Sequence, residues 1–422
     1  MILIMGLELC ISLTDVFIAG RIGKEVQASV GLVSQVYFIF VVIANALTVG
    51  TVSVVSRLFS AADRRALSNT IHTLLITTAG AGFLLGGLGI VLAPVLIRVL
   101  DVPPPLRDYG IPLIRIYAAS LIFHYLLINT NGILRASGRV KTSLRTMAGV
   151  CAVNVGLNFY LVFGTSLGFR GIAVSTAISM VLGALLNIAA VRTLISGPRR
   201  FSPASVGRVA RIGWPSGVTQ VAWQLGATFL FLIIGHLPRY PVEVMAALTN
   251  GLRIEAAIYL PAFALNMANA VMVGNLLGEG RDRDAFRSGV ITALFGVGLI
   301  TLLTVAVVLN AERLAGMLSD NAVVTRETVR YIYISMISEP FMAWAVILGG
   351  ALNGAGDTRG VMRIIILSLW LVRIPGSYIF GIGLGYGPMA FWWCMNASIF
   401  VHTIFLTRRF FARRWLQEAG RR

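Results

Sequence analysis

The sequence predicts an all-α integral membrane protein with about twelve membrane-spanning helices. Hydrophobic residues make up 57% of the 422 residues and charged residues only 12%, which leaves too few polar groups to cover a water-soluble surface. Apolar segments recur along the chain, each near or above the roughly 20 residues that a helix needs to cross the hydrocarbon core. The two halves of the chain also resemble each other, which predicts two similar helical bundles.

Twelve predicted spans follow one another along almost the whole chain. They cover residues 1–19, 27–56, 69–98, 109–135, 145–165, 170–194, 210–235, 243–276, 286–310, 326–352, 361–381 and 387–407. Several exceed about 25 residues, which predicts helices that tilt or extend beyond the bilayer. The chain opens directly in an apolar segment without a charged start, so no cleavable signal peptide is expected.

The distribution of basic residues predicts the orientation of the spans. The chain has 35 Lys and Arg against 17 Asp and Glu, a net charge of +18. The gaps after even-numbered spans and the C-terminal tail hold 23 of the basic residues, and the gaps after odd-numbered spans hold nine. The positive-inside rule therefore predicts that both termini and the even gaps are cytoplasmic. Because the basic residues lie mostly in the gaps and the tail, they indicate a multi-pass protein of the cell (inner) membrane and not a nucleic-acid-binding protein.

The chain repeats itself at an offset of 218 residues. Residues 132–138 fall onto 350–356, and the end of the second span, 55–63, falls onto 273–281. This predicts an N-terminal bundle at 1–196, a cytoplasmic linker at 197–209, and a C-terminal bundle with a basic cytoplasmic tail at 210–422. Each bundle has six spans, so both copies cross the membrane in the same sense. A parallel repeat of this kind is typical of transporters that carry substrate between the halves.

The repeat also predicts that the first helix lacks its beginning. The seventh span starts around Pro215, and the position equivalent to Pro215 would fall before Met1. We therefore expect that the full gene product extends upstream.

Few ionisable residues lie within the predicted spans. Asp15 lies in the first span with Glu8 two helical turns before it, so both should share one face. In the second half, Glu255 and Glu339 are the acids that lie within predicted spans. A charge within a span costs about 3 kcal/mol or more and usually faces a cavity or a partner. Asp15 is therefore either a functional acid or a paired one. Glu255 is either a transport residue or an ion-pair partner, for which Arg373 is a candidate.

Several motifs resemble the multidrug and toxic compound extrusion (MATE) family of cation-coupled efflux transporters, in its prokaryotic branch. Residues 14–23 around Asp15 are similar to the family's first-helix motif, and residues 350–359 to its signature after helix 10. Residues 154–164 and 171–176 are similar to its helix 5 and helix 6 patterns. The motifs occur in the family's order along most of the chain. The resemblance implies two bundles arranged in a V with a central cavity.

The resemblance also implies a function and a site. It implies a monomeric secondary antiporter that exports amphipathic or cationic organic compounds in exchange for H⁺ or Na⁺ by alternating access, without other cofactors. The residues that it implies hold the coupling ion are Asp15, Asn131, Asn154, Asn158 and Thr176, with Na⁺ ligated by Asp15, Asn154 and Asn158. Candidates in the second half are Glu255, Glu339 and Arg373.

Two departures from the family pattern limit how far the family's site residues can be assigned to this chain. Many relatives have Asp where this chain has Asn158, and some have Glu in helix 7 near Trp223. The polar side chains could instead join helices by hydrogen bonds without binding an ion.

Two other functions compete with antiport. One is a lipid or lipid-linked oligosaccharide flippase of the same wider superfamily. The other is a membrane enzyme, but the four histidines are not clustered, which argues against hydrolase or acyltransferase chemistry. The three cysteines, Cys10, Cys151 and Cys394, fit neither a disulfide framework nor a metal site. A nucleotide-binding P-loop pattern is also absent from the sequence, so ATP is not expected to drive transport.

Overall fold

The computed structural model describes residues 1–99, 103–195 and 200–416, and nearly all of them are helical. Within these ranges no strand occurs. The chain divides into two compact units, unit 1 (Met1–Trp214) and unit 2 (Pro215–Arg422). Part of the predicted linker, residues 197–199, and the end of the predicted basic tail, from residue 417, lie outside the described residues.

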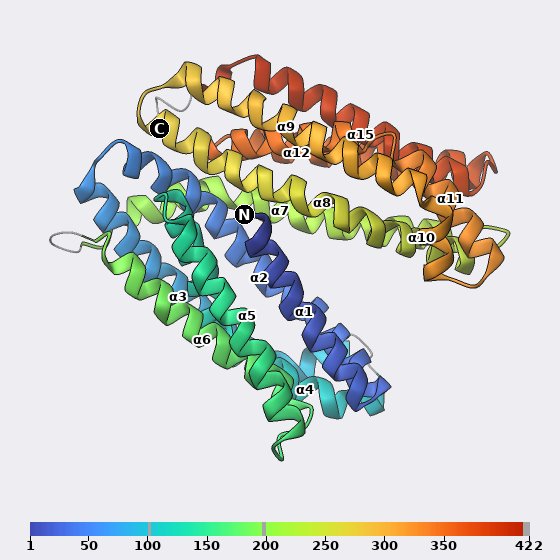
Figure 1. Cartoon of the computed structure of the whole chain (residues 1–422), viewed down its shortest axis with the longest axis horizontal. Helices are drawn as coiled ribbons and strands as arrows, with labels where there is room; N and C mark the ends of the chain where they lie inside the picture. The colour runs from blue at the N-terminus through green and yellow to red at the C-terminus, as the bar shows by residue number, and fades with distance from the viewer. Residues whose placement is uncertain (100–102, 196–199, 417–422) are drawn as a thin grey trace. The chain divides into compact units, whose positions relative to one another are not determined.

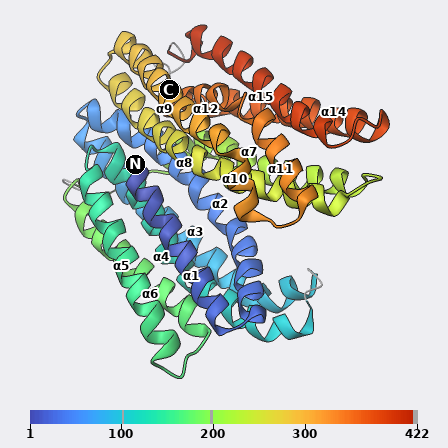
Figure 2. The same cartoon turned by 45° about the vertical axis from the view of Figure 1, so that its right-hand side comes forward.

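Unit 1 consists of six long helices and the beginning of a seventh (Figure 1). They are α1 (Ile2–Ile22), α2 (Lys24–Ser60), α3 (Arg64–Val99), α4 (Pro104–Ala136), α5 (Val140–Phe163), α6 (Arg170–Arg192) and the start of α7 (Pro203–Gly235). The first six coincide with the first six predicted spans. α4 packs on α2, α3 and α6, whereas α1 packs mainly on α5 and α2. Figure 2 shows α5 and α6 running alongside each other.

Unit 2 holds the remainder of α7 and the other helices. They are α8 (Pro241–Gly278), α9 (Asp282–Leu309), α10 (Ala311–Leu318), α11 (Ala322–Ser335), α12 (Glu339–Gly354), α13 (Thr358–Leu367), the π-helix η1 (Ser368–Arg373), α14 (Ile374–Gly376), the π-helix η2 (Ser377–Gly383) and α15 (Pro388–Phe411). Both α8 and α15 open on proline, whose fixed φ suits the first turn of a helix. The short helix α10 has no counterpart among the predicted spans.

In the described part of the chain, eleven helices or continuous helical stretches are long and apolar enough to cross a membrane. The bent pair α11 and α12 raises the number to twelve if it forms one span. The protein is therefore a multi-pass membrane protein, and its spans match the twelve predicted from the sequence.

Two spans of unit 2 depart from a regular α-helix. The tenth predicted span is broken between α11 and α12, which meet at 57°. Pro340 lies in the first turn of α12, where its missing N–H does not interrupt the helix. Across the break, the Asn396 side chain donates to the carbonyl of Ile334, 2.6 Å away, and accepts from the Ser338 hydroxyl. The eleventh span is π-helical on both sides of Pro375.

The repeat predicted at an offset of 218 residues is present in the backbone. Gly138 and Gly356, at equivalent positions, both have positive φ, 73° and 82°. Ala62 and Gly280 form a second equivalent pair, with φ of 56° and 72°. The turn that contains each of these glycines, Gly138 and Gly356, is closed by the same backbone hydrogen bond in both units. These bonds run from Arg139 N–H to Leu134 O and from Asp357 N–H to Leu352 O, each 2.8 Å.

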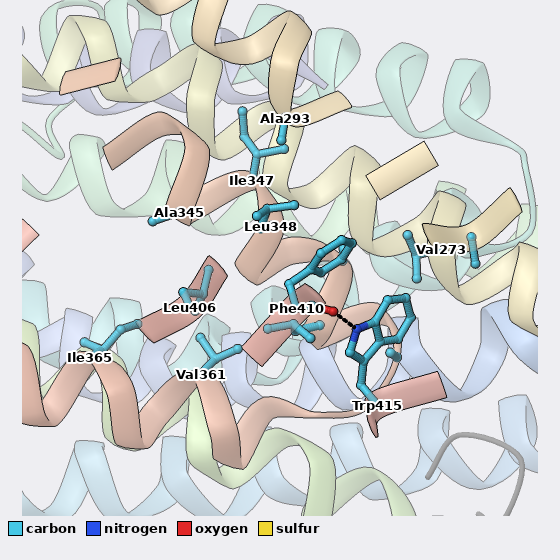
Figure 3. Packing of buried hydrophobic residues seen from close by; sticks show 14 residues of the cluster. Val273, Ala293, Ala345, Ile347, Leu348, Val361, Ile365, Leu406, Phe410 and Trp415 are labelled. Atoms are coloured by element: carbon cyan, nitrogen blue, oxygen red, sulfur yellow. Dashed lines mark hydrogen bonds between the residues drawn. The ribbon is translucent and has the colours of Figure 1, made fainter. Parts of the chain in front are cut away.

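Each unit has apolar cores of its own. In unit 2 one core ends on Phe410 and Trp415, whose rings stack with centroids 5.2 Å apart. The Trp415 indole N–H donates to the Phe410 carbonyl at 2.8 Å. Figure 3 shows this hydrogen bond in the same cluster as Leu348 of α12. Near the end of α15, the Arg409 guanidinium forms two hydrogen bonds to the Asp357 carboxylate, 2.6 and 2.7 Å long. These contacts fix α15 to the turn between α12 and α13.

Candidate functional site

Asp15 lies on the one face of α1 that is buried. That face carries Ile4, Asp15, Ile18 and Ala19, whereas most other side chains of α1 are exposed apolar residues. The Asp15 side chain is only 8% exposed. Glu8, which the helical spacing placed on the same face, is exposed. The first helix therefore buries one carboxylate and leaves the other accessible.

Asp15 accepts hydrogen bonds from two neighbouring helices. The Asn158 side-chain amide of α5 donates to Asp15 Oδ1 at 2.7 Å. The Thr176 hydroxyl of α6 donates to Asp15 Oδ2 at 3.1 Å. Hydrogen bonds to an ionised carboxylate are shorter and stronger than neutral ones, and both donors are buried. The carboxylate therefore joins α1 to α5 and α6.

Asn154 closes these contacts into a ring. Its side-chain oxygen accepts from the second N–H of the Asn158 amide at 3.2 Å, and its own amide donates to the Thr176 hydroxyl at 3.0 Å. Asn154 and Asn158 are one turn apart on α5, so their side chains leave the same face. Asp15, Asn158, Asn154 and Thr176 thus form a continuous cycle of hydrogen bonds, which we call the Asp15 ring.

The Asp15 ring presents oxygen atoms that suit a small cation or a proton. The Asn158 side-chain oxygen is buried and has no hydrogen-bond partner, which leaves an acceptor beside a carboxylate. Carboxylate, amide and hydroxyl oxygens all have lone pairs for a hard cation. A proton on Asp15 would convert one of its acceptors into a donor. Tyr117 of α4 packs in the same apolar core as Ile18 of α1 and Ile172 of α6, a neighbour that the sequence did not indicate.

Asn131, predicted as a fifth member of this site, belongs to a different cluster. Its side-chain oxygen accepts from Ser143 and from Asn187, both at 2.8 Å, and its amide points to the sulfur of Met147 at 3.2 Å. No hydrogen bond among the described residues joins it to the Asp15 ring. No pattern in the sequence groups Ser143 with Asn187, because they lie on different helices.

Glu255 of α8 forms the centre of a second polar site, in unit 2. The Tyr331 hydroxyl of α11 donates to Glu255 Oε1 at 2.6 Å, and the Tyr259 hydroxyl, one turn along α8, donates to Oε2 at 3.1 Å. Glu255 and Tyr331 are both buried. Tyrosine hydroxyls, not a basic residue, therefore satisfy this carboxylate.

Arg373 and Glu339 lie near this group without joining its direct contacts. No ion pair between Glu255 and Arg373 is present in the described part of the chain. Instead Arg373 donates from Nε to the Ser398 hydroxyl at 2.9 Å and lies over the Trp223 ring, 5.2 Å from its centroid. Glu339, the first residue of α12, is 1% exposed, and neither carboxylate oxygen has a hydrogen-bond partner.

Comparisons with known proteins place the chain among transporters. The profile of the MatE family matches residues 1–160 and 215–379. The uncharacterised transporter YisQ of Bacillus subtilis is 21% identical over 96% of this chain and 90% of its own length. The multidrug resistance protein PmpM of Pseudomonas aeruginosa is 25% identical over 96% of this chain and 88% of its own.

A solved structure shares the fold. It is the outward-facing conformation of a multidrug resistance MATE family transporter of the MOP superfamily, and it superposes with a TM-score of 0.89 at 20% identity. The match covers 98% of this chain and 94% of that one.

Proposed function

The chain belongs to the MatE family of multidrug and toxic compound extrusion transporters, and on this basis we propose that it is a secondary antiporter. In this proposal it exports amphipathic, often cationic, organic compounds in exchange for H⁺ or Na⁺. The coupling ion binds at the Asp15 ring, and the protein works by alternating access. The observation that carries the proposal is one buried carboxylate in a closed ring of polar side chains within a membrane-spanning bundle.

The ring supports coupling because its hydrogen bonds can be exchanged for ion contacts. Asp15 helps to hold α1 against α5 and α6 by accepting from Asn158 and Thr176. A proton or Na⁺ on the carboxylate would compete for the same lone pairs and so weaken this attachment. An ion that binds one arrangement of α1 more tightly than another shifts the equilibrium between them. The bound ion and the position of α1 would thus be linked.

The second-half residues remain candidates for a further role in this cycle. Glu339 is a buried carboxyl group without a hydrogen-bond partner, and Glu255 is held by two tyrosine hydroxyls. Buried acids in membrane proteins are usually functional. We propose Asp15 as the principal coupling residue because the four side chains of the Asp15 ring offer an ion more oxygen atoms than Glu255 and its two tyrosines do. Glu255, Glu339 and Arg373 then rank second.

Localisation and assembly belong to the same proposal. The basic residues that follow even-numbered spans support an inner (cytoplasmic) membrane location with both termini in the cytoplasm. We propose that the protein acts as a monomer, because each unit carries its own buried polar site and needs no second copy to complete it.

The decisive experiment compares Asp15→Asn with Glu8→Gln. Both substitutions remove one negative charge from α1, but only Asp15 is buried in a ring. Inverted membrane vesicles containing each variant would be mixed with ethidium, and its uptake would be measured under an imposed proton gradient or sodium gradient. In such vesicles, export by the protein appears as uptake. We expect Asp15→Asn to express normally and lose gradient-driven transport, and Glu8→Gln to retain most of it.

Transport by Asp15→Asn at the native rate against a gradient would place the coupling site elsewhere, and Glu255 and Glu339 would be tested next. Equal losses in both variants would attribute the effect to the charge of α1 and not to the ring.

A further inference from the structure

The chain after α15 forms a fixed turn against unit 2. Arg413, two residues past the end of α15, has φ of 56°, a left-handed conformation that side chains rarely adopt. After it the chain folds back, and the buried Trp415 stacks on Phe410 (Figure 3). On the other side, the Arg413 guanidinium lies over the ring of Phe286 on α9, 4.2 Å from its centroid. Contacts on both sides therefore fix the position of Arg413.

Exposed arginines lie around the place where the end of α15 meets the beginning of α9. Phe286 joins the two helices there, because its ring packs on Phe410 and Phe411 with centroids 5.2 and 5.4 Å apart. The arginines, which we call the α9–α15 arginine group, are Arg283, Arg287, Arg408, Arg413 and Arg414. None of them forms an ion pair with another residue in the part of the chain that the structure describes.

The acids at the start of α9 do not neutralise this group. Glu279 and Asp284 both pair with Arg281, at 3.0 and 2.9 Å, and Arg281 is not a member of the group. Asp282 is the other acid in the first turn of α9, and it opposes five positive charges with one negative charge. The α9–α15 arginine group therefore keeps an excess of positive charge, which attracts anions.

Exposed apolar side chains continue from the arginines along both helices. On α9, Ile291 and Phe295 follow Arg287 at intervals of four residues, and on α15 Ile404 precedes Arg408 by four. Residues four apart share a helix face, and Ile291, Phe295 and Ile404 are all exposed. Both helices are long and apolar enough to span a membrane. Each helix therefore presents arginine at its end and an apolar face towards the hydrocarbon, which matches the headgroup and the acyl chains of a phospholipid.

Unit 1 uses the equivalent surface in a different way. Offset by 218 residues, Arg287 corresponds to Asn69 of α3, whose side-chain oxygen accepts from the Arg200 backbone N–H at 3.0 Å. One turn along α3, the Thr73 hydroxyl accepts from the Ser202 N–H at 2.9 Å. Neutral side chains of α3 thus bind the chain that leads into α7. In unit 2 the same surface carries an exposed arginine instead, so the two copies have diverged here towards different partners.

We propose that the α9–α15 arginine group binds the phosphate headgroup of an anionic phospholipid, whose acyl chains lie along the exposed apolar faces of α9 and α15. Arginine suits this ligand because its planar guanidinium can donate two parallel hydrogen bonds to one phosphate. The distribution of basic residues predicts that these helix ends face the cytoplasm, the side on which basic pockets between membrane helices bind acidic headgroups. The site does not depend on the proposed antiport function.

The test measures binding of fluorescent phosphatidylglycerol to the full chain in a neutral detergent, with fluorescent phosphatidylcholine as the comparison without net charge. We expect the chain to prefer phosphatidylglycerol, and the preference to fall as salt is raised, because exposed charges are screened. Each basic residue near an anionic lipid contributes about 5-fold in affinity. Replacing Arg283 and Arg287 together by glutamine should therefore weaken binding by about 25-fold.

A second double variant, Arg413→Gln with Arg414→Gln, should weaken binding by a similar factor. This pair alters the turn after α15, so thermal unfolding in detergent checks that the variant is folded, whereas the α9 pair leaves the turn intact. The matched control is Arg239→Gln with Arg313→Gln. These two exposed arginines of unit 2 lie before α8 and after α9, at the ends of those helices away from the α8–α9 turn. The control should bind phosphatidylglycerol with native affinity.

Three results would overturn the site. Equal binding of the two lipids, or an equal loss in the control pair, would show that only the general surface charge attracts lipid. Displacement of the labelled lipid by inorganic phosphate would identify a phosphate site without a role for acyl chains. Loss of binding in a chain that ends at Leu416 would assign the lipid to the C-terminal arginines, Arg421 and Arg422, and not to the α9–α15 arginine group.

Discussion

At the scale of single residues, unit 1 separates its buried polar side chains into two groups with different consequences. The Asp15 ring contains a charge and an unpartnered amide oxygen on Asn158. The Asn131 cluster contains only neutral side chains, and the Asn131 oxygen accepts two hydrogen bonds. Both groups hold a buried amide oxygen without a hydrogen-bond partner, on Asn158 and on Asn187. The carboxylate of Asp15 is therefore what distinguishes the Asp15 ring as an ion site.

We predict that alanine at these two asparagines separates stability from coupling. Asn131→Ala would leave the Ser143 and Asn187 donors buried without their acceptor, so the free energy of unfolding should fall by about 1–3 kcal/mol. Its coupled transport per folded molecule should stay near native. Asn158→Ala removes the donor to Asp15 and should impair coupling more than stability. Thermal unfolding in detergent and ethidium efflux in vesicles would measure the two effects. Coupling lost in Asn131→Ala and retained in Asn158→Ala would contradict the assignment.

The sequence predicted the members of the Asp15 ring better than their surroundings. Asn154 and Asn158 are four residues apart and must share a helix face, and the family resemblance linked them to Asp15 and Thr176. Nothing in the sequence tells which helix face meets which neighbour, so the hydrogen bonds of Asn131 to Ser143 and Asn187 were not predicted. Tyr117 was missed for the same reason, because its place beside Ile172 depends on how α4 packs on α6.

At the scale of helices and turns, the two units keep the same connections but differ in the regularity of one span. In unit 1, α4 runs unbroken from Pro104 to Ala136 although it contains Pro112. Its counterpart in unit 2 is split into α11 and α12 at an angle of 57°. At the break the Ile334 carbonyl accepts from the Ile337 N–H at 3.3 Å and from the Asn396 side chain at 2.6 Å, so this backbone group stays paired within the membrane-spanning segment.

The spans were predictable because their length and apolarity follow directly from the thickness of the bilayer. The break in the tenth span was only partly predictable. A proline such as Pro340 is typical of a bent helix, but it fits the first turn of α12, and the Asn396 contact at the break comes from another helix. The π-helical turns around Pro375 and the short helix α10 have no signal in the apolar pattern.

The turn between α2 and α3 gives a prediction at this scale. Ala62 has φ of 56°, whereas its repeat partner at the same turn is Gly280. Side chains disfavour this left-handed region by about 1–2 kcal/mol, which the greater flexibility of glycine in the unfolded chain partly offsets. We expect Ala62→Gly to raise the Tm slightly and Gly280→Ala to lower it. Thermal unfolding of both variants in detergent measures this, and a lower Tm for Ala62→Gly would show that the alanine side chain makes a favourable contact.

At the scale of the whole molecule, the basic residues and the repeat agree on one orientation. The turn between α4 and α5 is followed at once by the exposed Lys141 of α5, and the turn between α10 and α11 carries the exposed Asp320. The excess of arginine after even-numbered spans predicts that the first turn faces the cytoplasm and the second faces outward. Both turns are short, so their charges fall within the range over which the rule applies.

Cysteine labelling of intact cells tests this orientation. In a chain whose three native cysteines are replaced by alanine, a cysteine at position 141 or 320 would be exposed to a membrane-impermeant maleimide. We expect label at position 320 and none at 141 until the cells are opened. The reverse pattern would invert the topology and place the arginine-rich turns outside.

The matching turns at Gly138 and Gly356 also bear on how such a chain could arise. A bundle with an even number of crossings returns the chain to the side of the membrane on which it started. Tandem duplication of a gene for one bundle therefore yields a fused product in which every helix keeps its original direction, and no helix has to be gained, lost or inverted. Selection could then act on the two copies separately. The turn geometry is one feature that both copies still share, and the difference between tyrosine at position 37 and glutamate at position 255 is an example of their divergence.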